Sequence, residues 1–107
     1  MLKLIKLTTA FATSLIILLS STAIAADGAG TYTAKGCPAC HGADAKTPVS
    51  PAYPKLAGQS KEYLSQQMKD IKSGARNNGQ AVIMKAIMAS VSEDDIKVLS
   101  EYLEGLK

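Results

Sequence analysis

The chain has 107 residues, 47% of them hydrophobic, and a formal net charge of +3, which allows one domain with a tail. Two of the twelve basic residues are Lys3 and Lys6, whereas all nine acidic residues lie at Asp27 or beyond, so residues 26–107 carry ten basic against nine acidic side chains, a net charge of +1. We therefore expect no nucleic-acid partner, because phosphate contacts need clustered lysines and arginines.

The first 25 residues have the order of a secretory signal sequence. Lys3 and Lys6 supply the positive start, an apolar stretch is densest from Leu15 to Leu19, and small residues end the segment at residues 23–25. An uncleaved membrane anchor is the alternative, but threonines and serines interrupt the stretch, which is short for a transmembrane helix of about 20 apolar residues. We expect residues 1–25 to be cleaved on export to the periplasm and residues 26–107 to form the mature domain.

The mature domain would need a stabilising group besides its own core. It has 82 residues, four tyrosines, and neither tryptophan nor phenylalanine. Domains of this size are marginally stable and usually depend on disulfides, a metal or a bound cofactor. The two cysteines, Cys37 and Cys40, lie too close together in sequence for a disulfide to close a stabilising loop.

The helices are expected in the following order. Residues 27–36 are rich in glycine and predict two turns of weak helix. Residues 42–58 contain Pro48, Pro51 and Pro54 and predict an ordered loop, because each proline removes a donor and disfavours helix before it. Residues 60–73 predict the first long helix, with serine as N-cap at its start and glycine directly after its end.

The remaining sequence predicts a polar turn over residues 75–81, a short apolar helix over residues 82–89 and a last helix from Ser92 to about Leu106. Three acidic residues follow Ser92 and oppose the positive end of the helix dipole. No segment has the alternation of a strand, so the predicted fold class is all-α.

Cys37-Pro-Ala-Cys40-His41 is the attachment signature of c-type haem. Two thiols at this spacing add to the two vinyl groups of haem, and the adjacent histidine then lies where it can ligate the iron. A thioredoxin-type dithiol would need a βαβ setting, and a zinc site would need four ligands. The chain has two cysteines and one histidine, so we predict one haem c, attached through Cys37 and Cys40 and ligated by His41.

The second axial ligand determines the chemistry. An iron with an open position would bind gases or peroxide, as in a haem-based sensor or a peroxidase-like protein, whereas a methionine ligand favours electron transfer. Met68 lies on the apolar face of its helix and is expected to pack in the core. Met84 and Met88 both lie between the polar turn and Ser92, and the residues alone leave both open as ligands.

The chain resembles a class I c-type cytochrome and is most similar to one half of the two-domain periplasmic dihaem cytochromes c. The segments that carry this resemblance are CPACHG (37–42), YPKLAGQ (53–59), YLSQQMKDIKSGAR (63–76), IMKAI (83–87) and VSEDDIKVLSEYLEGL (91–106). The resemblance implies about four short helices wrapped around one covalent haem. It implies Met84 as the iron ligand, eight residues before Ser92, with Met88 as the alternative.

The resemblance also implies roles around the haem. The carbonyl of Pro54 would accept a hydrogen bond from the other ring nitrogen of His41 and orient the ring. Gly30 would pack against Tyr102. Apart from the resemblance, Arg76 is expected to pair with a haem propionate or to remain an exposed helix-end cation. Four lysines would rim a docking face or simply form solvated surface; they are Lys46, Lys55, Lys61 and Lys85.

These observations predict an exported monohaem electron carrier between redox protein donors and acceptors, associated with membranes only through membrane-bound partners. No general acid or base is identifiable, so we do not expect an enzyme. The alternatives are the sensor or peroxidase-like protein with an open iron site and a cytochrome subunit of an oxidoreductase complex. The single haem motif is compatible with a monomer or with a homodimer that imitates the two-domain form.

Overall fold

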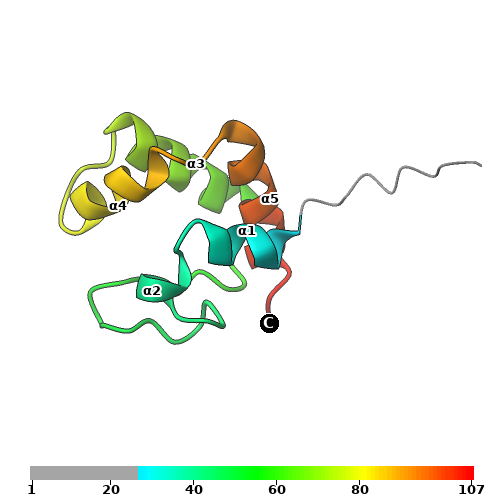
Figure 1. Cartoon of the computed structure of the whole chain (residues 1–107). Helices are drawn as coiled ribbons and strands as arrows, with labels where there is room; N and C mark the ends of the chain where they lie inside the picture. Colours follow the sequence, from blue (N-terminus) through cyan, green and yellow to red (C-terminus); the bar gives the residue numbers. More distant parts are fainter. Residues whose placement is uncertain (1–26) are drawn as a thin grey trace, which may run out of the picture.

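The computed structural model describes residues 27–107, which form five helices and contain no strand (Figure 1). The helices are α1 (Gly28–Ala34), α2 (Pro38–His41), α3 (Lys61–Ser73), α4 (Ala81–Met88) and α5 (Glu93–Glu104). The all-α prediction is confirmed. The helix beyond the four expected is α2, a single turn inside the haem-attachment signature. The predicted signal segment, residues 1–25, lies outside the described residues.

The two longest helices begin and end where local chemistry predicts. The hydroxyl of Ser60 accepts a hydrogen bond from the backbone N–H of Tyr63, and Gly74 ends α3 in the left-handed conformation with φ of 87°. Ser92 and Asp95 form a reciprocal capping box at the start of α5. Each such cap stabilises a helix by roughly 0.5–2 kcal/mol, because it satisfies backbone donors that have no partner inside the helix.

The core forms where α5 packs against α1 and α3, and α3 packs against α4 (Figure 1). Tyr32 of α1 is almost fully buried, and its ring centroid lies 6.0 Å from that of Tyr102 on α5. The expectation that Gly30 packs against Tyr102 was wrong. Gly28 makes this contact, because it lies one helical turn before Tyr32 on the face of α1 that meets α5, whereas Gly30 is exposed.

The loop between α2 and α3 is ordered, as predicted, and it folds around Ala45. Ala45 is fully buried with φ of 57°, and its carbonyl accepts hydrogen bonds from the N–H groups of Leu56 and Ala57. The carboxylate of Asp44 accepts hydrogen bonds from the backbone of Thr47 and its neighbour, which hold the pKa of Asp44 below its ordinary value. The Asp44 bonds shape the start of the loop, and the Ala45 bonds hold its far end, at Leu56 and Ala57, against that start.

Among residues 27–107, no helix combines the length and the apolar character that a membrane crossing requires.

Candidate functional site

A cavity of about 330 Å³ lies inside the helical domain and receives side chains from α2, α3, α4, α5 and the α2–α3 loop. Most of its wall is apolar. Five residues that the sequence singled out as site residues line it together: Cys37, Cys40, His41, Pro54 and Met84. Met68, Met88, Arg76 and Lys55 line it as well, whereas Lys46, Lys61 and Lys85 are not part of its wall.

The attachment signature is preorganised by its own backbone. Pro38 occupies the first turn of α2, where its missing N–H costs no helical hydrogen bond, and the N–H of His41 donates to the carbonyl of Cys37 at 3.0 Å. Gly42 ends the turn with φ of 86°. Both cysteines are free and partly buried, and burial raises the pKa of the Cys37 thiol. Both thiols line the apolar cavity.

His41 is buried, with 6% of its surface exposed, and its Nδ1 lies 2.9 Å from the carbonyl oxygen of Pro54. A carbonyl oxygen can only accept a hydrogen bond, so Nδ1 carries the proton and donates. In the neutral ring, the lone pair then resides on Nε2, the nitrogen available to a metal. The ring of Tyr53 stands edge-on to the imidazole, with centroids 6.4 Å apart.

Three methionines line the cavity, and their burial separates them. Met68 and Met88 belong to the core, with 7% and 2% of their surfaces exposed. Met84 is only partly buried and packs against the edge of that core from α4. Of the three, Met84 is therefore the methionine with the least of its surface buried by other protein side chains.

Two charged residues line the cavity, Lys55 and Arg76, and both are cationic. The guanidinium of Arg76 donates to the side-chain oxygen of Gln67 on α3 at 2.9 Å. Sequence reasoning missed Gln67, because it is one of several residues at helical spacing on α3. Nothing in its distance from Arg76 along the chain indicates a contact, since the chain reverses at Gly74 between the two residues.

The chemical groups of these residues are those that a covalently attached haem requires. Two thiols are held by a helical turn, an imidazole presents Nε2, and an apolar wall holds a thioether. The cations Lys55 and Arg76 suit the carboxylates of such a ring. Among residues 27–107, no cluster of three or more histidine, cysteine or acidic side chains could hold a metal ion by itself.

Comparison with known proteins gives a consistent result. The family model described as Cytochrome c matches residues 25–107. The chain is 39% identical over 71 residues to cytochrome c4 of Azotobacter vinelandii, which covers 65% of this chain and 34% of that protein. It is 38% identical over 97 residues to a protein of Stutzerimonas stutzeri named thiosulfate dehydrogenase electron acceptor. This alignment covers 84% of this chain and 44% of that protein.

A third relative matches over more of its own length. Cytochrome c-554(548) of Halomonas halodenitrificans is 38% identical over 66 residues, which covers 62% of this chain and 78% of that protein. The chain thus spans less than half the length of the first two relatives and most of the length of the third.

Proposed function

This chain belongs to the cytochrome c family, whose members bind haem c covalently, and we propose that it is a monohaem electron carrier in which His41 and Met84 would ligate the haem iron. The observation that carries the proposal is a shared cavity. His41 from α2, with its proton held on Nδ1, and the thioether of Met84 from α4 line the same apolar space beside two thiols.

Each residue has a role in this function. Bound haem supplies an iron that gains and loses one electron reversibly. Cys37 and Cys40 would hold it as thioethers, and the carbonyl of Pro54 would orient the His41 ring and raise the basicity of its Nε2. As the second ligand, Met84 would raise the reduction potential relative to a nitrogen ligand in the same place. The apolar wall excludes water, so little solvent has to reorganise when the charge on the site changes.

Arg76 supports the same function from the rim of the cavity. Its guanidinium donates a hydrogen bond to Gln67, and no acidic side chain among residues 27–107 lines the cavity to neutralise it. We propose that it pairs with a haem propionate. Lys55, the other cation of the wall, lies beside Pro54 and is the second candidate for this pairing.

The spectrum of the purified holoprotein tests the proposal. We expect a reduced-minus-oxidised spectrum of one c-type haem and, in the oxidised protein, the weak Met-to-iron band. A wild-type protein that lacks this band and binds carbon monoxide readily would instead have an open iron site, and the sensor or peroxidase-like function would replace the electron carrier.

We further propose that residues 1–25 direct export to the periplasm and are removed after Ala25. The amino-terminal order of charge, apolar stretch and small residues supports this proposal. Mass spectrometry of the holoprotein should show the loss of residues 1–25. Retention of Met1 would support the membrane-anchor interpretation.

The partners would be redox proteins. One relative is named as the electron acceptor of thiosulfate dehydrogenase, so that enzyme is the first donor to test. Reduction of the oxidised holoprotein by thiosulfate only when the dehydrogenase is present would identify it as a donor. Absence of reduction would exclude this donor and leave the carrier function to be tested with others.

A further inference from the structure

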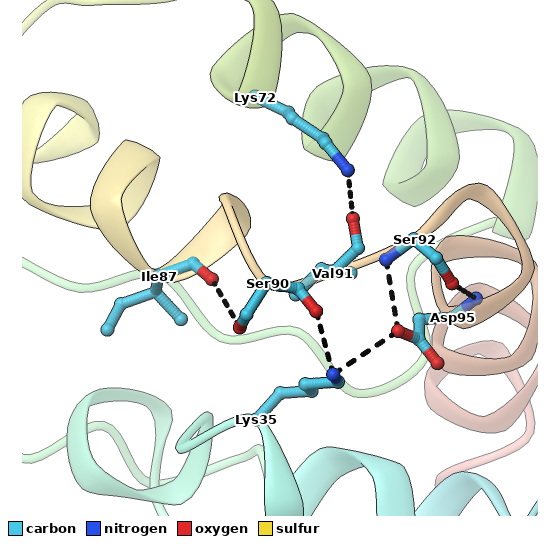
Figure 2. Close-up of polar contacts among 7 residues, drawn as sticks. All are labelled: Lys35, Lys72, Ile87, Ser90, Val91, Ser92 and Asp95. Carbon is cyan, nitrogen blue, oxygen red and sulfur yellow. Dashed lines mark hydrogen bonds and ion pairs between the residues drawn. The ribbon is translucent and has the colours of Figure 1, made fainter.

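The connection between α4 and α5 is held by two lysines from other helices. Helix α4, which carries Met84, ends at Met88, and α5 begins at Glu93. Figure 2 shows that the carbonyl oxygens of Ser90 and Val91, which follow each other in this connection, each accept a hydrogen bond from a lysine ammonium. Lys35 binds Ser90 at 2.7 Å, and Lys72 binds Val91.

Lys35 links the segment that leads into the attachment signature to the α4–α5 connection. It is the C-cap residue of α1 and lies two positions before Cys37, so its backbone leads directly into the attachment signature. Its ammonium also lies 3.5 Å from a carboxylate oxygen of Asp95, and that carboxylate is held in turn by the capping box of α5 (Figure 2). The Lys35 side chain is 26% exposed, so its contacts are partly shielded from water.

Lys72 approaches from a third helix. It lies in the last turn of α3, and α3 packs against both α4 and α5. The connection is therefore held from α1 and from α3 at consecutive carbonyls. Both ammonium groups lie just beyond the C-terminal end of α4, where helix carbonyls lack intrahelical partners and the dipole is negative.

Helix α4 packs against α3, but few of its side chains are buried. It contributes only Ala81 and Met88 to the buried core, whereas Ile83 and Ile87 line the cavity and are 58% and 43% exposed. Segments that bury little protein surface open at low cost in free energy, so the contacts that hold the ends of α4 bear on how firmly Met84 is placed. At its C-terminal end, the connection is held by the buried side chain of Val91 and by the two lysine hydrogen bonds.

We propose that Lys35 and Lys72 form a clamp on the α4–α5 connection that positions Met84 at the iron and limits the opening of this ligand. The proposal rests on Met84 as the axial ligand. Neither lysine lines the cavity. Lys35 acts through Ser90, Lys72 acts through Val91, and α4 carries the constraint to Met84.

Two substitutions test the clamp in the haem-loaded ferric protein. Lys35→Met and Lys72→Met keep an unbranched apolar side chain and remove the ammonium donor. Lys97→Met is the matched control, because Lys97 pairs with Glu101 on the exposed side of α5 at 3.8 Å and does not contact the connection. Lys35→Arg keeps both the charge and the donors.

Imidazole is the probe, because it binds the iron only in molecules whose methionine ligand has opened. We expect each lysine-to-methionine variant to bind imidazole several-fold more tightly, and the double variant ~10-fold more tightly, since a larger open population raises the apparent affinity. In Lys35→Met and in Lys72→Met, the Met-to-iron band should disappear at a lower denaturant concentration than the helical circular dichroism signal. Lys97→Met and Lys35→Arg should behave as the wild type.

Wild-type imidazole affinity in both lysine-to-methionine variants would overturn the clamp. A parallel loss of the band and of helicity would do the same, because it would assign the lysines a role in general stability only. The wild type separates this failure from that of the proposed function. If its oxidised spectrum lacks the Met-to-iron band, the Met84 ligand and the clamp both fail; if the band is present and the variants are unchanged, the clamp alone fails.

Discussion

The carbonyl oxygen of Pro54 lies 2.9 Å from Nδ1 of His41, although the two residues are 13 positions apart in sequence. The contact exists because the α2–α3 loop closes on the buried carbonyl of Ala45 and returns Pro54 to the side of α2. A backbone carbonyl is an acceptor that substitution of the side chain cannot remove. Its position, however, depends on the restricted φ of proline.

Pro54→Gly should therefore weaken the placement of this carbonyl without deleting it. A less firmly held His41 is a less basic ligand and stabilises ferric iron less, so we expect the reduction potential to rise. The added freedom of the unfolded chain should also lower the free energy of unfolding by about 1 kcal/mol. Voltammetry and denaturant titration of the holoprotein check both effects. Pro51→Gly, in the same loop, is the control and should leave the potential unchanged.

Met84→Ala and Met88→Ala should differ in kind. Met84→Ala is expected to remove the Met-to-iron band, lower the potential and let carbon monoxide or azide bind readily, because it removes a ligand. Met88 is 2% exposed, so Met88→Ala should create a packing defect that costs ~2–5 kcal/mol while the band remains. Met68→Ala should behave like Met88→Ala. If the results for Met84 and Met88 were exchanged, Met88, one helical turn further along α4, would be the ligand, and the proposed electron-carrier function would still hold.

Removal of both attachment thiols should remove the haem. In Cys37→Ala/Cys40→Ala, the cavity between α2 and α4 would lose the group that fills it, and a domain of this size has little other core. We expect a protein without covalent haem absorbance that is largely unfolded by circular dichroism. A cooperatively melting apoprotein would show that the helices pack without haem and would contradict this expectation.

Gly28→Ala should destabilise the contact between α1 and α5. A β-carbon at Gly28 would lie 2.3 Å from Cβ of Tyr102, too close for two carbon atoms. The helices must separate to admit it, at a cost of ~1–3 kcal/mol in the free energy of unfolding. Gly30→Ala is the matched control, because its added carbon would meet only the side chain of Asp27 at the exposed start of α1. Equal melting temperatures for the two variants would contradict the packing argument.

Tyr32 should make stability depend on alkaline pH. Burial raises the pKa of Tyr32 from 10.0 to about 12, so the folded state holds the phenol proton over a range in which the unfolded state loses it. The stability contribution is complete below pH 10 and is lost as the pH rises towards 12. Thermal melting of the wild type should therefore show a loss in this window that Tyr32→Phe lacks.

The same variant has a second effect at neutral pH. The phenol of Tyr32 donates to the carbonyl of Gly42 at 2.6 Å, directly after the attachment signature. Tyr32→Phe should therefore cost roughly 0.5–1.5 kcal/mol at pH 7. An unchanged alkaline loss of stability in Tyr32→Phe would contradict the assignment of that loss to Tyr32.

The amino-acid sequence by itself determined the features that depend on near neighbours. The caps at Ser60 and Ser92 are contacts over three residues, and the left-handed stop at Gly74 needs only the absence of a side chain. The attachment signature is likewise contained in five consecutive residues. Local features of this kind are legible because their geometry follows from the spacing along the chain, whatever the rest of the fold does.

Only the tertiary structure decided which distant groups meet. Helical periodicity indicates that α1 has a packed face, but the choice between Gly28 and Gly30 depends on the rotation of α1 against α5. The pairing of Arg76 with Gln67 and of Lys35 with the Ser90 carbonyl depends on how the chain reverses between helices. Backbone carbonyls carry no sequence signal at all, because every residue has one, so the clamp on the α4–α5 connection is visible only once the helices are packed.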